Sequence, residues 1–434
     1  MIQIQRLIPY GVILLLALGV SSPQANAGLT PIQQLGKELF FDAISQPANQ
    51  SCASCHSSKA GWTGQIAGAN IHGAVYRGAQ RQRFGNRKPP TTAYSPFSPI
   101  FHFDMGKGAF VGGMLWDGRA TGANLGNPAA DQALGPFLVD PEQNMPSKQA
   151  VCEVVAASKY ADLFEDVWGP GSLDCSDTGV DAMFDRVGLS IAAYEASHEV
   201  SPFDSVFDDY WRACLDAGND PEDCGKAEGD KATLDPTGIL NDQEFAGLIE
   251  FGEYCSVCHV SHVPGPDGQP PLFTDFTFEN IGVPKNPENP FYRMDEVLGD
   301  DGNPINPDGD AFIDLGLGGF LGGHINPDWQ AMAEDNDGKH KVPTVRNVDK
   351  RAGFGFPKAY MHNGVFKNLE EVVHFYNTRD VLAEGWPLPE VDRNVNRMIL
   401  EGVPLGNLEL GKEAEAAIVA FLKTLSDRTV VKKK

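Results

Sequence analysis

The chain has 434 residues, with 34 Lys and Arg against 58 Asp and Glu, so its formal net charge is -24 at pH 7. This acidity argues against nucleic acid as a partner, and it favours a basic or dipolar protein partner or simple solubility. The length is enough for two or three domains with their own cores. The 47 Gly and 31 Pro predict long ordered loops wrapped around something other than helices, such as a large rigid cofactor.

The first 27 residues predict a signal peptide. Arg6 precedes an apolar run, Val12 to Val20, and an Ala-x-Ala cleavage site ends at Ala27. The run is too short and wrongly flanked for a membrane anchor. We therefore expect an exported, periplasmic protein that begins at Gly28 and has no membrane span.

One short motif occurs twice, as "SCASCH" and "YCSVCH". Both are C-x-x-C-H, in which two thiols attach a c-type haem and the histidine binds its iron. A redox cysteine pair or a zinc site would not explain a histidine directly after both motifs. The two motifs predict two covalently attached c-type haems. Their residues are Cys52, Cys55 and His56, then Cys255, Cys258 and His259.

Four cysteines lie outside these motifs. In an oxidising compartment their even number predicts two disulfides, for which three connectivities exist. Sequence proximity favours pairing Cys152 with Cys175 and Cys214 with Cys224.

Amphipathic spacing predicts a mainly α chain with weak strand signals. One helix precedes each haem motif, so each half is expected to run from a helix through the motif into loops. The predicted helices are Pro31–Asp42, Lys148–Trp168, Val180–His198, Asn241–Cys255, Leu369–Tyr376 and Lys412–Ser426.

Four further motifs extend the pattern over nearly the whole mature chain: "WDGRA" from Trp116, "QALGPF" from Gln132, "KVPTVRNV" from Lys341 and "YMHNGVFKNLEEVVHFYN" from Tyr360. With them the chain resembles the bacterial di-haem cytochrome c peroxidase and MauG family, closer to the MauG-like (MbnH-like) branch. This resemblance implies two cytochrome c-like haem domains. The N-terminal, peroxidatic domain would span residues 28–200 and the C-terminal, electron-transfer domain residues 201–434.

The two branches differ in the second ligand of the C-terminal haem. The peroxidase branch uses Met there, and the MauG branch uses Tyr, which the resemblance places at Tyr376. A thioether raises the iron potential, whereas a phenolate stabilises higher oxidation states. The alternative is that Tyr376 packs in the core and Met361 binds the iron.

The resemblance also implies residues that handle hydrogen peroxide at the first haem. Gln132 would orient the peroxide, and Glu142 would move a proton from one peroxide oxygen to the other. Pro136 lies between Gln132 and Glu142 in sequence. Glu142 is also readable as part of a solvated loop. Trp116 would relay oxidising equivalents between the haems, or pack as a structural indole.

Two further residues are ambiguous. His72 lies 16 residues after His56, where the peroxidase branch carries a removable iron ligand, but its glycine-flanked loop is equally consistent with simple exposure. Members of the family often hold calcium between the domains. Asn86 is a weak candidate ligand, because the family's asparagine would fall nearer Lys88.

Three functions follow as hypotheses. The first is MauG-like oxidation of a residue on a partner protein by hydrogen peroxide. The second is a reductively activated cytochrome c peroxidase, supplied with electrons by a small cytochrome or cupredoxin. The third is a di-haem electron carrier without catalysis, against which the pair Gln132 and Glu142 argues, because a carrier needs no acid-base pair.

Overall fold

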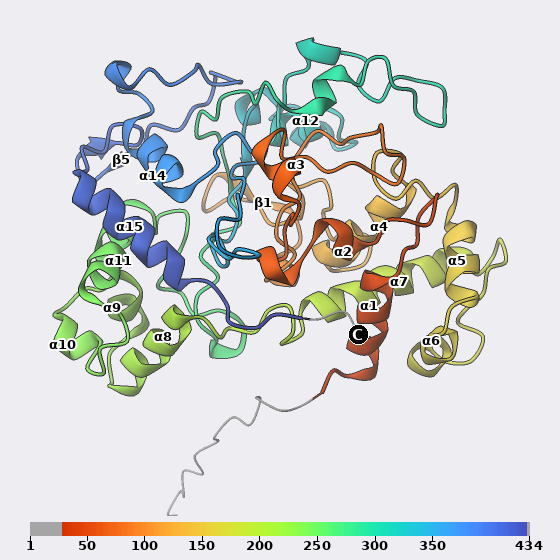
Figure 1. Ribbon diagram of the computed structural model, residues 1–434, viewed down its shortest axis with the longest axis horizontal. Coiled ribbons are helices and arrows are strands. Elements are labelled where there is room, and N and C mark those ends of the chain that lie inside the picture. Colours follow the sequence, from red (N-terminus) through yellow and green to blue (C-terminus); the bar gives the residue numbers. More distant parts are fainter. Residues whose placement is uncertain (1–27, 432–434) are drawn as a thin grey trace, which may run out of the picture.

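The computed structural model describes residues 28–431 (Figure 1). The predicted signal peptide, residues 1–27, lies outside the described residues. The prediction of a mainly α chain is confirmed, since β structure in the described part consists of three antiparallel two-stranded ladders and isolated bridges. Within residues 28–431, no helix combines the length and apolar character needed to cross a membrane.

The helices are α1 Pro31–Phe41, α2 Cys52–Cys55, α3 Ala67–Ile71, α4 Pro128–Leu138, α5 Lys148–Ala156, α6 Ala161–Trp168, α7 Val180–Glu195, α8 Val206–Asp216, α9 Pro221–Lys226, α10 Lys231–Leu234, α11 Asp242–Tyr254, α12 Leu317–Gly322, α13 Pro327–Gln330, α14 Leu369–Thr378 and α15 Lys412–Thr424. The strands pair in sequence order and are β1 His102–Asp104, β2 Ala109–Val111, β3 Phe278–Glu279, β4 His340–Lys341, β5 Ile399–Leu400 and β6 Val403–Pro404.

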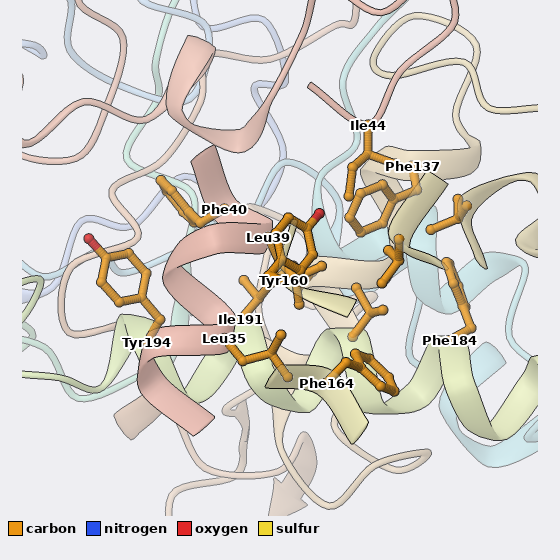
Figure 2. Close-up of a cluster of buried hydrophobic side chains, with 14 of the residues drawn as sticks. Leu35, Leu39, Phe40, Ile44, Phe137, Tyr160, Phe164, Phe184, Ile191 and Tyr194 are labelled. Carbon is orange, nitrogen blue, oxygen red and sulfur yellow. The ribbon is translucent and has the colours of Figure 1, made fainter. Parts of the chain in front are cut away.

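The N-terminal half is built on α1, which packs against α7 (Figure 2). Thr30 caps α1 in a capping box, and Pro31 fills its first turn. Gly36 lies at the crossing, where an added Cβ would stand 1.9 Å from the carbonyl oxygen of Ser190. Leu35, Leu39 and Phe40 then enter a core that these helices share with α4, α5 and α6.

The C-terminal half repeats this arrangement with α11 and α15, on the opposite side of the molecule in Figure 1. Asn241 caps α11 in another capping box. Gly247 lies at the crossing, with an added Cβ 1.9 Å from the carbonyl oxygen of Ala417. The core residues of the first large apolar cluster run in sequence from Leu35 to Phe203, and those of the second run from Phe207 to Leu425. The domain boundary between residues 200 and 201 stays a prediction.

Most predicted helices form within two or three residues of their expected ends, but one prediction is wrong. The helix expected over Lys148–Trp168 is broken into α5 and α6. Ser158 accepts a hydrogen bond from the backbone N–H of Tyr160 at 3.3 Å, which competes with helix continuation. Tyr160 then turns to donate to Asp42 at 2.6 Å.

Both favoured disulfides are confirmed, Cys152 with Cys175 and Cys214 with Cys224. The first ties α5 to the loop before α7. The second ties α8 to α9. The four haem-motif cysteines are free.

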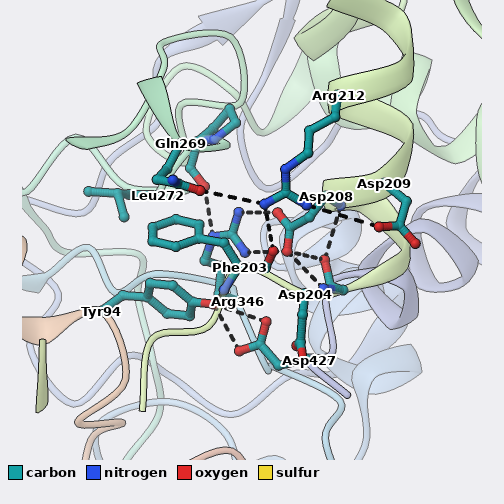
Figure 3. Close-up of polar contacts among 12 residues, drawn as sticks. Tyr94, Phe203, Asp204, Asp208, Asp209, Arg212, Gln269, Leu272, Arg346 and Asp427 are labelled. Carbon is teal, nitrogen blue, oxygen red and sulfur yellow. Dashed lines mark hydrogen bonds and ion pairs between the residues drawn. The ribbon is translucent and has the colours of Figure 1, made fainter. Parts of the chain in front are cut away.

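Tyr94 of the N-terminal half contacts two buried residues of the C-terminal half, Arg346 and Asp427 (Figure 3). Arg346 donates to both carboxylate oxygens of Asp208 at 3.1 and 2.6 Å, and its guanidinium stacks over the ring of Tyr94. The segment after α15 crosses to the N-terminal half, where Tyr94 donates to Asp427 at 2.9 Å and Val431 exchanges hydrogen bonds with Ser58. The last residues therefore complete the packing of the first half.

Candidate active site

The first haem motif lies on the single turn of α2. The ring Nδ1 of His56 is 3.1 Å from the carbonyl oxygen of Trp62, which fixes Nδ1 as the donor and leaves Nε2 for a metal. Burial lowers the pKa of His56 to about 4, so the ring is neutral at pH 7. Burial also raises the pKa of the Cys55 thiol to about 12.

A cavity of about 70 Å³ opens at this motif, and we call it the N-terminal cavity. Gln132 and Pro136 reach it from α4, and Glu142 reaches it from the loop after α4. Glu142 is an exposed residue, while desolvation by the surrounding protein raises the pKa of its carboxyl. The structure thus brings the three predicted peroxide-handling residues to the haem motif.

Two lining residues of the N-terminal cavity escaped the sequence analysis. Gln143 is 4% exposed, and neither its amide nitrogen nor its amide oxygen has a hydrogen-bond partner among residues 28–431. Glu195, at the end of α7, is also buried, and burial raises the pKa of its carboxyl to about 8. A carboxylate four residues after Ile191 on the buried face of α7 was the available signal for Glu195.

The second haem motif follows α11. Nδ1 of His259 is 3.2 Å from the carbonyl oxygen of Phe273, the same arrangement as in the first motif. Cys255, Cys258 and His259 line a cavity of about 300 Å³, which we call the C-terminal cavity. This volume lies in the usual range for a ligand site, whereas the N-terminal cavity is smaller.

Tyr376 and Met361 both line the C-terminal cavity. Tyr376 projects from α14, and burial, followed by the neighbouring Cys258 and Cys255 thiols, raises the pKa of its phenol. No hydrogen bond involves its hydroxyl within the described part of the chain. Met361 lies in the loop before α14 with a φ of 67°, a left-handed conformation that is rare for a side chain of its size.

Trp116 also lines the C-terminal cavity, in the "WDGRA" loop. Its indole N–H donates to the carbonyl oxygen of Lys88 at 2.9 Å. Its own carbonyl oxygen accepts from the backbone N–H of Lys341 at 2.8 Å. Lys88 comes from the N-terminal half and Lys341 from β4, so Trp116 is held by both halves of the chain.

A buried polar cluster next to Trp116 was not expected. The rings of His340 and His362 stack with centroids 3.6 Å apart, and the His362 ring lies edge-on to Trp116 at 6.4 Å. Asp314 completes a set of three potential metal ligands. However, Arg87 donates to both oxygens of Asp314 at 2.7 and 2.6 Å, and parallel rings do not aim their lone pairs at one point. We infer that this cluster holds the Trp116 ring in place and does not bind a metal.

The two ambiguous residues lie elsewhere. His72 follows α3 with its side chain 73% exposed, 3.9 Å from Glu288, and it does not line the N-terminal cavity. The carbonyl oxygen of Asn86 accepts from Asn289 at 2.7 Å. Neither residue gains support as a metal ligand from these positions.

The donor sets fit c-type haem. Four of the eight cysteines are free, and these are the four in the C-x-x-C-H motifs. Each motif ends in a histidine whose Nδ1 faces a backbone carbonyl. A zinc site would need two more ligands beside each cysteine pair, and no such group of ligands forms there among residues 28–431.

Comparison with known proteins agrees with this fit. Residues 31–213 match the family described as di-haem cytochrome c peroxidase. The chain is 31% identical to the methylamine utilization protein MauG of Paracoccus denitrificans (strain Pd 1222), over 94% of this chain and 92% of MauG. It is 25% identical to the cytochrome-c peroxidase IdrP2 of Pseudomonas sp. (strain SCT), over 93% of this chain and 83% of IdrP2.

A solved structure shows the same fold. The diheme peroxidase BthA from Burkholderia thailandensis E264 superposes with a TM-score of 0.67 and 26% identity, covering 93% of this chain and 88% of BthA. A tyrosine-to-methionine variant of BthA superposes with a TM-score of 0.68 and 25% identity, over 92% of this chain and 86% of the variant.

Proposed function

The chain belongs to the di-haem cytochrome c peroxidase family that includes MauG, and from this premise we propose that it is a periplasmic enzyme using hydrogen peroxide to oxidise a residue of a partner protein. It is an oxidoreductase of a family that carries two haems. The observation that supports peroxide chemistry is the N-terminal cavity, where Gln132, Pro136 and Glu142 meet the first haem motif. An electron carrier would need none of these three residues.

At the N-terminal cavity, His56 would bind a haem attached through Cys52 and Cys55, and the iron supplies the site at which peroxide is reduced. Glu142 takes the proton from the nearer peroxide oxygen and returns it to the departing one. Gln132 orients the peroxide through its amide. Release of two waters consumes two protons and two electrons, and the partner protein supplies both electrons.

Transfer between the sites is assigned to Trp116. Its indole N–H is held by the carbonyl oxygen of Lys88, and its backbone carbonyl oxygen is held by the N–H of Lys341 in the C-terminal half. An aromatic ring fixed in this way keeps one orientation while electrons pass. The stacked pair His340 and His362 restricts the ring further from one side.

At the C-terminal cavity, His259 would bind a haem attached through Cys255 and Cys258, and we assign Tyr376 as the second iron ligand. Tyr376 presents a hydroxyl without a hydrogen-bond partner among the described residues and lies near both thiols. The higher identity to MauG than to IdrP2 supports the same choice. Met361 remains the competing ligand, and inter-domain calcium gains no support from Asn86.

The first test is the visible and near-infrared spectrum of the oxidised holoprotein before and after one equivalent of hydrogen peroxide, without reductant. We expect an immediate change that involves both haems and includes near-infrared absorption. In a Tyr376→Met variant this change should be lost, because a thioether favours the reduced iron. Met361→Leu is the matched control and should behave as the unmodified chain.

A different result supports the second function. If nothing changes until one electron is added, the chain is a reductively activated peroxidase supplied by a small cytochrome or cupredoxin. If peroxide has no effect in either state, the enzyme proposal fails and a carrier remains.

A further inference from the structure

Two lysines flank Trp116 and have no carboxylate partner. The side chains of Lys88 and Lys341 both line the C-terminal cavity. The ammonium group of Lys88 makes only long hydrogen bonds, 3.2 Å to the Thr63 hydroxyl and 3.4 Å to the Pro89 carbonyl. Lys341 donates to the carbonyl of Gly112 at 3.0 Å. Among residues 28–431, neither forms an ion pair.

Neither ammonium group has an anion in direct contact among residues 28–431, although that of Lys341 lies over the rings of Phe276 and Phe278 at 5.1 and 5.4 Å and is influenced by the charge of Asp275. Desolvation lowers the pKa of Lys88 to about 8 and that of Lys341 to about 7. Positive charge held on a cavity wall without an anion is costly unless the bound ligand supplies one. The cavity therefore fits a ligand with carboxylate groups as well as a large apolar body.

A third lysine on the same wall shows the contrast. The ammonium group of Lys358 donates to the carbonyls of Ala60, Asn347 and Lys350 at 3.0, 2.7 and 2.9 Å. All three of its protons are used within the chain, so it has none left for a ligand. Lys88 and Lys341 keep this capacity.

We propose that Lys88 and Lys341 bind the two propionate groups of the haem in the C-terminal cavity. The inference rests on the proposed haem at Cys255, Cys258 and His259, and not on peroxide chemistry. Each lysine contacts Trp116 through its backbone, so propionate binding by its side chain couples the haem edge to the position of the indole. Both lysines act as positioning residues.

The test compares reduction potentials of the two haems in Lys88→Gln and Lys341→Gln with those of the unmodified holoprotein. Removing a cation beside a propionate disfavours the added electron. We expect the equilibrium constant for reduction of the C-terminal haem to fall about tenfold, which is 59 mV for one electron. Lys148→Gln is the control, because that side chain is 41% exposed, pairs with Asp181 at 2.6 Å and lines neither cavity.

Lys88→Arg and Lys341→Arg keep the charge but change the donor geometry. Their potentials should stay near the original, while the resonance Raman propionate bending band should shift. They also serve as the test if a Gln variant fails to mature. An unchanged band, or Gln variants that shift only the N-terminal haem or neither haem, overturns the inference. Fewer than two haems in the unmodified protein, counted as pyridine haemochrome, would instead overturn the proposed function.

Discussion

The proposed peroxide chemistry depends on the protonation state of one residue, Glu142. Its carboxyl has a raised pKa because the cavity wall desolvates it, and the charge of Arg119 offsets only part of this effect. A carboxylate with a raised pKa takes a proton more readily than a glutamate with an ordinary pKa, and it is also neutralised at higher pH. The rate of peroxide turnover should therefore fall in mildly acidic solution, where Glu142 becomes protonated.

We predict that Glu142→Gln lowers the rate of peroxide turnover by about 10² to 10⁴-fold, the usual contribution of a general base, while both haems remain. In the unmodified protein, the rate should fall as the pH drops toward the pKa of Glu142. This fall should begin at a higher pH than for an ordinary glutamate, whose pKa is about 4.3. Stopped-flow kinetics with peroxide over a pH series measures both effects. A variant that keeps the original rate would remove Glu142 from the mechanism.

Residues within one motif were predictable from sequence, and residues brought together by the fold were not. Cys52, Cys55 and His56 are local, so their spacing alone indicated their role. The stacked rings of His340 and His362 come from separate loops, and nothing in either segment indicates the other. Only the family resemblance predicted that Gln132 and Glu142 lie beside the first haem motif.

At the scale of elements, local signals set most helix positions. Apolar spacing predicted α1 together with a first-turn proline, and α11 together with an Asn/Asp cap, because these signals lie within or next to the helix itself. The break between α5 and α6 was missed, because the apolar spacing continues across a turn made by Ser158. Helix α8 was also missed, although Ser205 and Asp208 form a capping box at its start.

Asp208 on α8 accepts hydrogen bonds from Arg346, which lies in a loop that lines the C-terminal cavity. Its carboxylate and the Arg346 guanidinium are both 0% exposed. Burial alone would raise the pKa of Asp208, but the charge and hydrogen bonds of Arg346 outweigh it and lower the pKa. Asp208→Ala would leave a buried, unpaired guanidinium.

We expect Asp208→Ala to lower the free energy of unfolding by about 3 to 5 kcal/mol. Asp209→Ala on the same helix is the control, because its contacts with Arg428 and Arg212 are exposed and the expected loss is below about 1 kcal/mol. Denaturant unfolding of the holoproteins, followed by circular dichroism, compares the two. Equal losses would mean that the buried pair contributes no more than a surface pair.

At the scale of the whole molecule, the two halves share polar links as well as the proposed haem region. Lys358 in the C-terminal half donates to Ala60 in the N-terminal half at 3.0 Å. Asp427 accepts from Tyr94 and, at 2.6 Å, from the side-chain amide of Asn347. Such long-range pairs leave no local pattern, so the sequence predicted two units without predicting how they are joined.

We predict that a chain ending at Ser426 loses several kcal/mol of stability, since each buried hydrogen bond to a charged group contributes about 1.5 to 3 kcal/mol. The N-terminal half should then melt first, because Tyr94 and Ser58 lose their partners. Calorimetry of the truncated holoprotein tests this. Removal of residues 432–434 alone keeps these contacts and is the control. One unchanged transition in the longer truncation would show that the segment is dispensable.

The contact between Val431 and Ser58 also bears on the order of assembly. In a chain exported N-terminus first, the thiols of the first motif leave the membrane long before residue 431 follows. The first half must then wait, incompletely packed, while almost the whole chain emerges. Haem attachment needs reachable thiols, and this late closure leaves a period in which they are still accessible. In a chain exported in this order, the final residues would complete the packing of the first half only after its thiols had been accessible for haem attachment.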